Sequence, residues 1–343
     1  MDLVVLRPEG LYCPPGDFYI DPWRPVERAV ITHAHGDHAR PGNARYLATD
    51  ASRTVLEARL PGIGLDTLGY GERVVQGGVA ISLHPAGHVL GSAQVRIEHE
   101  GVVWVVSGDY KLAPDPTCAP FESLRCTTFV TESTFGLPVY RWQEPAIVID
   151  DIATWWRRNA EANRTSVLYC YAFGKAQRIA CELAAIGALD IGPLACHGAM
   201  LALSAAYRAS GVPVPEMQHA SVLPRDTLRR ALVLAPPSAA GTPWLRRFGD
   251  TSDAFASGWM QIRGARRRRA LDRGFALSDH ADWPGLNAAI AATGATRVMV
   301  THGKVAPMVR WLGERGFDAD AFATEFASEG EPEAAAGIDV DTA

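Results

Sequence analysis

Short apolar runs that each end in a polar or charged residue are the dominant pattern of this chain. Residues 28–32 lead into His33, residues 102–106 into Gly108-Asp109, and residues 128–131 into Glu132. Between residues 93 and 98 apolar and polar positions alternate, which is the period of a strand with one buried face. Further strands are expected at 79–83, 274–277 and 297–300. Polar residues at strand ends are where α/β proteins place their chemistry.

The middle of the chain has a different pattern. Residues 147–158 have helical spacing, and residues 166–171 read as a strand. Gly174 and a helix over 175–186 follow, and two further strands are expected at 194–196 and 231–234. This strand–glycine–helix order predicts a parallel α/β layer.

Composition and length fit a globular protein with one large domain or two medium ones. The chain has 343 residues, of which 48% are apolar and 21% charged. No apolar run reaches the length of a membrane span, and the N-terminus lacks the pattern of a secretory signal. We therefore expect a cytoplasmic protein that does not enter a membrane. The six cysteines form no CxxC pair, so they are expected to be reduced and mostly buried, although Cys13 could be exposed.

The net charge of -5 argues against a nucleic-acid partner only until its distribution is considered. Eight acidic residues and no Lys or Arg follow Arg315, so the rest of the chain carries +3. The segment 327–343, rich in Glu, Ala and Gly, has the composition of a disordered acidic tail. Basic charge is carried almost entirely by Arg, which fits a GC-rich genome and phosphate binding equally well.

The strongest chemical signal is the segment 32–38, THAHGDH. Residues two apart in an extended loop point the same way, so His33 and His35 can hold one ion together. Asp37 and His38 lie just beyond, where Gly36 lets the chain bend, and can face a second ion. Imidazole and carboxylate groups suit zinc, manganese or iron. Three His and one Asp in six residues after a buried strand therefore predict a metal site.

Four residues cannot complete two coordination spheres, so further ligands are needed. Asp109 ends a buried strand, and a carboxylate that bridges two cations avoids the cost of burial without a partner. His88 lies in a glycine-flanked loop and is favoured over His84, although spacing alone leaves both open. The full set of candidates is His84, His88, Asp109, His280 and His302.

Three segments together resemble the metal-ligand motifs of the metallo-β-lactamase-fold hydrolases. They are HAHGDH at 33–38, AGHVLGS at 86–92 and SGDY at 107–110, in that family's order. The resemblance implies a four-layer αββα sandwich that binds two divalent ions, Zn²⁺ or Mn²⁺. It also implies the ligands: His33, His35 and His88 for one ion, Asp37, His38 and His302 for the other, and Asp109 as the bridge.

The remaining motifs resemble the β-CASP branch of that fold, which comprises nucleases that process nucleic acids. They are TESTFG at 131–136, YAFGKAQ at 171–177, ASGW at 256–259, LSDHAD at 277–282 and VTHG at 300–303. The match covers about residues 10 to 310. It implies a core of residues 1–138 and 256–326 with an inserted α/β β-CASP domain at 139–255, followed by the tail at 327–343.

The resemblance also implies a mechanism for phosphodiester hydrolysis. Two metals about 3.5–4 Å apart supply a nucleophile and stabilise charge on both sides of the phosphorus. His280 would then protonate the leaving oxygen. Glu132 would position His280 or a ligand His, and Asp279 or Asp282 could orient the ring of His280 or simply cap a helix.

Phosphate contacts are predicted at the start of the helix beginning at residue 175 and in two other segments. A cation at a helix N-terminus is a plausible phosphate contact, although an exposed lysine or a solvated arginine run explains these residues almost as well. The candidates are Lys175, Ser133, Thr134, Arg266 and Arg267, the last two within the run 266–269.

Four functions compete. The wording of several segments resembles the bacterial DNA-ligase-associated exonucleases, which favours a DNA exonuclease in repair and a functional association with a DNA ligase. An RNA-processing nuclease of the same branch is the alternative, since RNA-acting and DNA-acting members share most motifs. A hydrolase of thioesters or lactams would rarely need the long segment at 140–255. A non-enzymatic scaffold would have lost some of the ligands.

Overall fold

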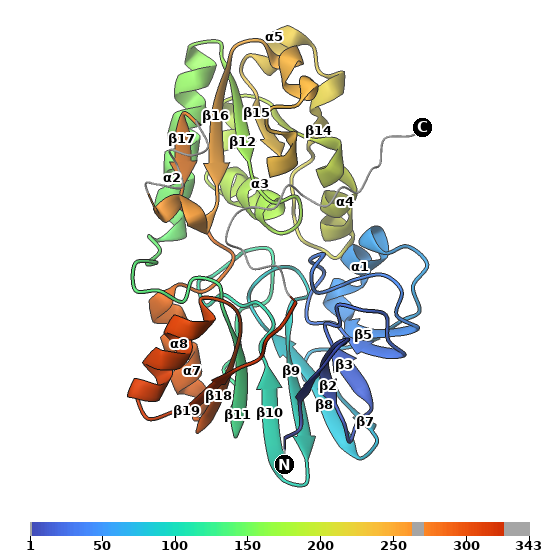
Figure 1. The fold of residues 1–343 in the computed structure, drawn as a ribbon. Coiled ribbons are helices and arrows are strands. Elements are labelled where there is room, and N and C mark those ends of the chain that lie inside the picture. The colour runs from blue at the N-terminus through green and yellow to red at the C-terminus, as the bar shows by residue number, and fades with distance from the viewer. Residues whose placement is uncertain (1, 263–270, 326–343) are drawn as a thin grey trace.

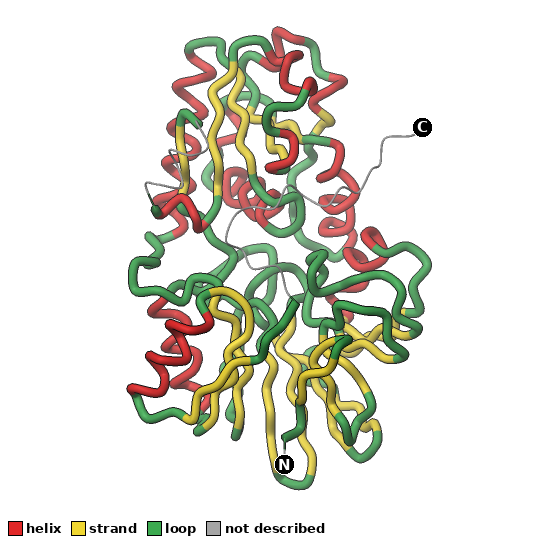
Figure 2. The backbone as a smooth tube through the Cα atoms, in the orientation of Figure 1, coloured by secondary structure: helices red, strands yellow, loops and turns green. Residues whose placement is uncertain are grey.

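The computed structural model describes residues 2–262 and 271–325, and it has a mixed α/β architecture with three sheets. Two sheets form the lower part of the molecule in Figure 1, and the third forms the upper part with most of the middle of the chain. Figure 2 shows the same division, with loops gathered between the two parts. The predicted tail and the predicted phosphate contacts Arg266 and Arg267 lie outside the described residues.

The first sheet has strands in the order β1-β2-β3-β4-β5-β6. The pairs β1·β2 and β2·β3 are antiparallel, and the later pairs are parallel. Helix α1 (Arg53–Arg59) connects its last two strands. The strands are β1 (Val5–Arg7), β2 (Gly10–Cys13), β3 (Phe18–Ile20), β4 (Arg28–Val30), β5 (Arg45–Thr49) and β6 (Leu65–Leu68).

The second sheet has the order β19-β18-β11-β10-β9-β8-β7. Its strands from β7 to β10 are antiparallel, and those from β10 to β19 are parallel. They are β7 (Arg73–Gln76), β8 (Val79–Pro85), β9 (Ala93–His99), β10 (Val102–Val106), β11 (Thr128–Ser133), β18 (Arg297–Gly303) and β19 (Asp318–Ala321). Helices α7 (Trp283–Thr293) and α8 (Val305–Glu314) lie beside it in Figure 1.

Strand β10 shows how the lower part is layered. Its Trp104 and Val106 enter a core shared with the first sheet, where Phe18 and Ile20 lie. Between them Val105 points to the opposite face and packs in a core with residues of α7 and α8. Because side chains alternate across a strand, an uninterrupted apolar run is what a sheet covered on both faces requires.

The third sheet is parallel throughout, with the order β14-β13-β15-β12-β16-β17. Its strands are β12 (Thr165–Tyr169), β13 (Leu194–Cys196), β14 (Gln218–His219), β15 (Leu232–Ala235), β16 (Thr251–Ala256) and β17 (Arg273–Phe275). Its helices are α2 (Pro145–Glu161), α3 (Lys175–Ala185), α4 (Leu201–Ala209) and α5 (Arg225–Leu228). The parallel layer expected from the middle of the sequence is therefore present, and β17 extends it beyond the predicted boundary at residue 255.

Helix ends follow their sequence signals. Pro145 occupies the first turn of α2, where its missing N–H costs nothing. The Asp282 side chain caps α7 by accepting from Gly285 N, and Gly294 ends that helix in the left-handed region at φ 63°. Short 3₁₀ helices complete the connections: η1 (Asp50–Ser52), η2 (Ala188–Asp190), η3 (Gly198–Met200), η4 (Ala220–Val222), η5 (Pro237–Ala239), η6 (Pro243–Phe248) and η7 (Gly258–Gln261).

One hydrophobic core joins the two parts of the molecule. Leu168 of β12 and Ile179 of α3 belong to the same buried cluster as Tyr46 of the first sheet and Leu56 of α1. The joint also contains a close backbone approach. At Gly174 (φ 86°) a Cβ atom would lie 2.4 Å from Val89 Cγ1, so the turn before α3 needs a glycine.

All six cysteines are free. Cys13 is fully buried, which corrects the expectation that it could be exposed: its strand β2 is buried along its whole length between the neighbouring strands. The helices of the described part of the chain all fall short of the length and apolarity that crossing a bilayer requires.

A candidate metal centre

The loop after β4 carries four of the predicted ligands. His33 is buried and His35 half-buried, and one ring nitrogen of each lies within 4.8 Å of ligand atoms of His88 and Asp109. The Nε2 atom of His88 is 3.0 Å from Nδ1 of His35, and the Nε2 atom of His33 is 3.5 Å from Oδ2 of Asp109. The structure thus brings together the four residues of the first predicted metal position.

A second group shares Asp109 with the first. The Nε2 atoms of His38 and His302 lie 3.5 Å from Oδ2 and 3.0 Å from Oδ1 of Asp109, respectively. Oδ2 of Asp37 lies 3.7 Å from the same nitrogen of His38. Asp109 follows Gly108 (φ 57°), where a Cβ atom would lie 2.7 Å from Thr32 Oγ1. Glycine therefore allows the end of β10 to approach the histidine loop closely enough to insert the carboxylate.

Protonation states in the first group suit a cation. Burial lowers the pKa of His33 and His88 well below the ordinary value, and it lowers the pKa of His35 to about 4. These rings are therefore neutral at pH 7, the form that ligates metals. Burial opposes ionisation of Asp109, but His38 and His302 outweigh it and hold its pKa well below the ordinary range.

An unsatisfied polar atom also points to a missing positive charge. The Nε2 atom of His33 is buried and has no hydrogen-bond partner among the described residues. Leaving a buried polar atom without a partner is costly. A divalent ion held by the imidazoles and the carboxylate would satisfy it, so these buried groups could hold metal. Their donor set, nitrogen and oxygen without sulfur, fits Zn²⁺ or Mn²⁺.

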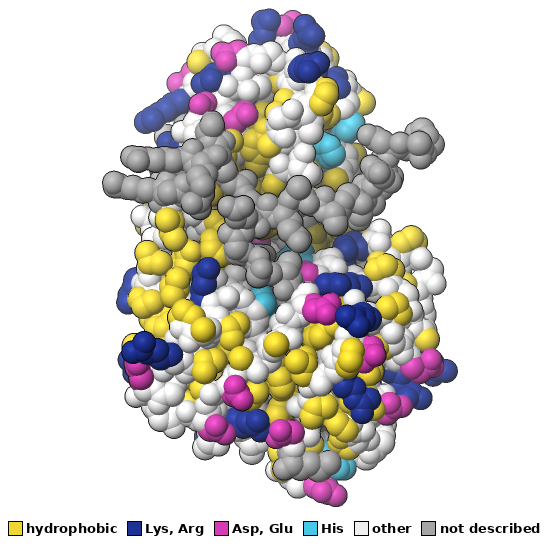
Figure 3. All heavy atoms as spheres, viewed as in Figure 1, with side chains coloured by type: hydrophobic (Ala, Val, Ile, Leu, Met, Phe, Trp, Pro, Cys, Tyr) yellow, Lys and Arg dark blue, Asp and Glu magenta, His cyan; other side chains and the backbone are white. Residues whose placement is uncertain are grey.

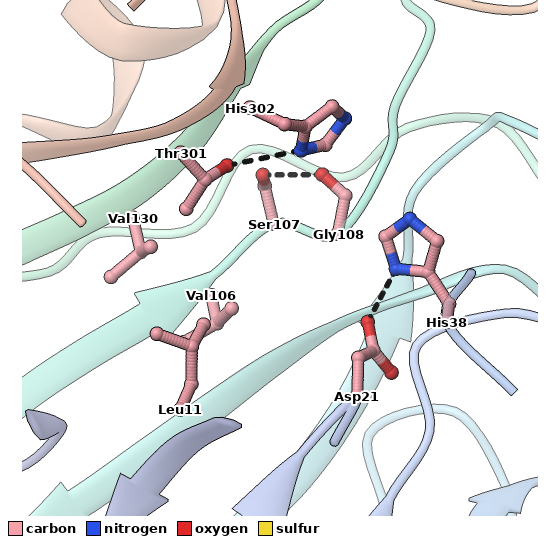
Figure 4. A pocket seen from close by; sticks show the side chains of 9 residues that line it. All are labelled: Leu11, Asp21, His38, Val106, Ser107, Gly108, Val130, Thr301 and His302. Atoms are coloured by element: carbon pink, nitrogen blue, oxygen red, sulfur yellow. Dashed lines mark hydrogen bonds and ion pairs between the residues drawn. The ribbon is translucent and has the colours of Figure 1, made fainter. Parts of the chain in front are cut away.

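Residues around the cluster fix the orientation of the rings. Asp21 contacts Nδ1 of His38 at 2.7 Å, and it accepts hydrogen bonds from Thr32 N at 2.8 Å and Thr32 Oγ1 at 2.5 Å. The Asp279 carbonyl contacts Nδ1 of His88 at 2.7 Å. Figure 4 shows the Asp21–His38 contact below the ring of His302. Each contact occupies Nδ1 and leaves Nε2 to face Asp109, as in ligand histidines generally.

Asp21 was missed by the sequence analysis. It follows strand β3 directly and has left-handed backbone at φ 44°, which Asp tolerates better than most residues. An acidic residue at the end of an apolar strand is the signal that identified Asp109, and it was present here as well. The short apolar run Phe18–Ile20 made that signal weak.

His280 and Glu132 form the third part of the cluster. The two Glu132 oxygens lie 3.1 and 3.0 Å from Nδ1 of His280, and Oε1 also accepts from Tyr110 N at 2.8 Å. Ligand atoms of Glu132, His280 and Asp109 all lie within 4.8 Å of one another. His280 is half-buried, whereas Glu132 is fully buried. Glu132 therefore orients the half-exposed imidazole at the edge of the cage.

Other predicted residues have different partners. Asp282 caps α7, and Asp279 pairs with cations, so neither carboxylate orients His280. His84 contacts Ser82 Oγ at 3.0 Å and Glu122 at 3.2 Å, away from the cluster. Of the two histidines that spacing left open, only His88 belongs to the described metal groups.

The predicted phosphate contacts that the structure describes are buried. The ammonium of Lys175 lies 2.8 Å from Oδ2 of Asp279, and its side chain is 3% exposed. Ser133 donates to the His302 carbonyl at 2.8 Å, and Thr134 is fully buried. Lys175 therefore takes part in an internal ion pair, because the turn before α3 folds against the Val89 loop instead of facing solvent.

Comparison with known proteins identifies a relative with a similar sequence and a solved structure with a similar fold. No model of a known protein family matches the chain. A protein of Opitutus terrae described as "Probable DNA ligase" is 30% identical over 313 residues, which is 90% of this chain and 30% of that protein. The chain therefore spans 30% of the length of this curated relative.

Among solved structures, the fold is similar to the crystal structure of a protein of unknown function from Enterococcus faecalis V583. The TM-score is 0.56 at 13% identity, and the match covers 87% of this chain and 79% of the other. At that identity the likeness is one of fold alone.

Proposed function

We propose that this chain is a two-metal-dependent nuclease that hydrolyses phosphodiester bonds of DNA as an exonuclease in repair. The observation that supports it most directly is the position of Asp109, whose carboxylate is shared by two groups of buried ligand atoms. A carboxylate between two cation positions is the arrangement that phosphodiester hydrolysis by paired metals uses. The cluster also has a partly exposed histidine, His280, at its edge, as a proton donor to a leaving group requires.

The ligand assignment in this proposal follows the two groups and adds Asp37 to the second, because its carboxylate lies 3.7 Å from Nε2 of His38. His33, His35, His88 and Asp109 hold one ion, and Asp37, His38, His302 and Asp109 hold the other. Support comes from the short distances between these ligand atoms and from the burial of His33, His38, His88, Asp109 and His302. When bound, the two ions would supply a nucleophile from water at neutral pH and neutralise charge on the phosphate.

The chain's own residues have the remaining tasks. His280 donates a proton to the leaving oxygen through its Nε2 atom, while its Nδ1 atom faces Glu132. Glu132 keeps the ring oriented through the contacts of its two carboxylate oxygens with Nδ1. Burial of the cage excludes bulk water, which strengthens each of these interactions.

We assign the chain to the metallo-β-lactamase fold and its β-CASP branch. The two facing sheets of the lower part and the helices beside the second sheet are consistent with an αββα sandwich. In this assignment residues 1–138 and 256–326 form the core, residues 139–255 form the insertion, and 327–343 form a tail. The insertion's sheet takes one strand, β17, from the later core segment.

DNA is favoured over RNA as the substrate because the sequence relative is named a probable DNA ligase. The similarity covers only 30% of that protein, so a nuclease segment joined to, or working with, a ligase would account for it. A ligase acts on strand ends, and an exonuclease prepares such ends. We propose a functional association of that kind.

Hydrolysis of labelled substrates tests the proposal. Protein reconstituted with Zn²⁺ or Mn²⁺ is incubated with 5′- and 3′-labelled single- and double-stranded DNA and with matched RNA. We expect stepwise shortening of DNA from one end, and its loss in Asp37→Ala and His280→Ala. His84→Ala is the matched control, since this histidine lies outside the cluster. Cleavage of RNA without cleavage of DNA would contradict the substrate assignment, and no cleavage of either by metal-loaded protein would contradict the function.

A further inference from the structure

A nuclease also needs side chains that contact the phosphate of its substrate. The predicted phosphate contacts that the structure describes are buried. The metal-binding loop shows where the substrate can approach. Within it His33 and His38 are buried, His35 and Asp37 are half-buried, and Gly36 is exposed. The cage is therefore most accessible along the edge that runs through Gly36. On the face drawn in Figure 3, histidine side chains are visible where the upper and lower parts meet.

Arg59, the last residue of α1, lies against this edge. One Nη1 hydrogen of its guanidinium is donated to the Ala34 carbonyl, between the first two histidines of the loop. Its Nη2 atom lies 3.4 Å from the position that a Cβ atom would take at Gly36. A Cβ atom at Gly36 would be in van der Waals contact with the guanidinium, and the glycine leaves this face of Arg59 uncovered.

Within the part of the chain that the structure describes, Arg59 has no ion-pair partner that accounts for its position. No carboxylate among residues 2–262 and 271–325 lies within 4.0 Å of its guanidinium. Its Nε and Nη2 atoms donate no hydrogen bond within the described chain, yet neither is among the fully buried atoms that lack a partner. Both therefore keep some solvent-accessible surface and have donor hydrogens to spare.

The electrostatic surroundings agree with an external anion. Burial lowers the pKa of the Arg59 guanidinium, and the nearby Asp37 carboxylate opposes that shift. A half-buried guanidinium without a counter-ion carries a desolvation cost. Its planar set of donors matches the oxygens of a phosphate group, which would offset that cost.

The position of α1 places Arg59 at the boundary between the two parts of the molecule. Thr54 of the same helix contacts Ser210 Oγ at 2.6 Å and donates to the Ala206 carbonyl of α4 at 3.1 Å. Figure 1 shows α1 beneath α4 at this boundary. A strand of nucleic acid that reaches the cage between the two parts would pass this helix end.

We propose that Arg59 binds a phosphate oxygen of the substrate beside the metal-binding loop. This inference rests on the proposed function, because the ligand is the phosphate on which the metals would act or its neighbour in the chain. In this role Arg59 is a binding residue that holds the substrate and donates no proton. Its contribution belongs to substrate affinity more than to the rate of the chemical step.

Three variants in the full-length, metal-loaded protein test it. Arg59→Ala removes the donor, and Arg59→Lys keeps the charge without the planar fork. Arg53→Ala is the matched control on the same helix, where an exposed arginine pairs with Glu57. For each we measure metal content, KM and kcat on single-stranded DNA, the salt dependence of DNA binding, and the dissociation constant of inorganic phosphate by calorimetry.

We expect Arg59→Ala to raise KM and the phosphate dissociation constant about tenfold or more, the usual scale for a charged hydrogen bond. Arg59→Lys should recover part of the loss, and Arg53→Ala should leave both constants unchanged. The salt slope for DNA should flatten by about 0.7 in Arg59→Ala, as loss of one phosphate contact to a single strand predicts. Metal content should stay at the wild-type level.

Two results would overturn the inference: KM and phosphate affinity within about twofold of wild type, or loss of metal from Arg59→Ala. The second would show that Arg59 only supports the loop through Ala34. The phosphate titration separates this inference from the proposed function. If wild-type protein cuts no nucleic acid but Arg59→Ala still weakens phosphate binding, the anion site stands and the proposed nuclease activity fails.

Discussion

The ammonium nitrogen of Lys175 lies 2.8 Å from Oδ2 of Asp279, in the joint between α3 and the loop that carries His280. Asp279 also receives Arg178 Nη1 at 3.2 Å, and its backbone carbonyl contacts the ring of His88. Burial lowers the pKa of Lys175 to about 8, although Asp279 opposes the shift. Helix α3 of the third sheet therefore holds a loop that touches the candidate metal centre.

This pairing predicts a large loss of stability in Asp279→Asn. The substitution leaves Lys175 and Arg178 buried without their shared anion, and breaking a buried pair from one side typically costs about 3–5 kcal/mol. Urea denaturation measures the change in the free energy of unfolding. Asp318→Asn is the control, since that carboxylate is 77% exposed in its ion pair and should contribute within about 0.5 kcal/mol. Equal effects of the two variants would contradict the prediction.

Acid should destabilise the same contact between α3 and the loop that carries His280. Burial opposes ionisation of Asp115, but Lys111 and Arg178 outweigh it and keep its pKa below the ordinary value. A carboxyl group with a lowered folded-state pKa contributes stability that is full above the unfolded pKa of about 3.9 and is lost below it. We expect the free energy of unfolding to fall as pH decreases below about 5. In Asp115→Asn the decrease should be shallower, and an unchanged slope would count against it.

Measurements of metal binding should distinguish His88 from His84, the two histidines that sequence spacing alone could not distinguish. His88→Ala removes a nitrogen that lies 3.0 Å from His35 Nδ1, so we expect weaker binding of one ion and a stoichiometry that falls by about one. His84→Ala should keep the wild-type stoichiometry. Elemental analysis after dialysis and competition with a chelator give both quantities. A loss of metal from His84→Ala alone would reverse the assignment.

Asp21 should affect metal affinity by holding the ring of His38 in place. Its carboxylate contacts Nδ1 of that ring at 2.7 Å, and removing such an outer partner typically lowers metal affinity about 10–100-fold. Chelator competition on Asp21→Ala, beside the Thr32→Val variant, measures the effect. Unchanged affinity in Asp21→Ala would show that packing alone fixes the ring.

Kinetics should distinguish Glu132 from His280. His280→Ala removes the proposed proton donor, which typically lowers kcat about 10²–10⁴-fold. Glu132→Gln keeps the shape but loses the charge beside Nδ1, and we expect a smaller decrease of about 10–100-fold. Full activity in His280→Ala would contradict the assignment.

Sequence reasoning located the parts of the site that depend on local pattern. The loop 33–38 combines histidine spacing with a preceding strand, and Asp109 follows an apolar run directly, so neither required knowledge of the fold. The parallel order of the third sheet was also predictable, since strand, glycine and helix alternate there.

Contacts made by distant packing could not be predicted. Lys175 looked like a helix-start cation facing a phosphate, because nothing in the sequence shows that Gly174 packs on Val89 and directs the ammonium to Asp279. Arg59 carries no distinguishing signal in the sequence, because only the packing of α1 brings it to the histidine loop. Both assignments depend on residues more than twenty positions away.

The most direct test is a crystal structure of the protein soaked in Mn²⁺, with anomalous diffraction measured at the manganese edge. The account predicts two peaks about 3.5–4 Å apart, one beside His33, His35 and His88 and the other beside His38 and His302, with Asp109 touching both. A single peak, or two peaks that do not share Asp109, would contradict it.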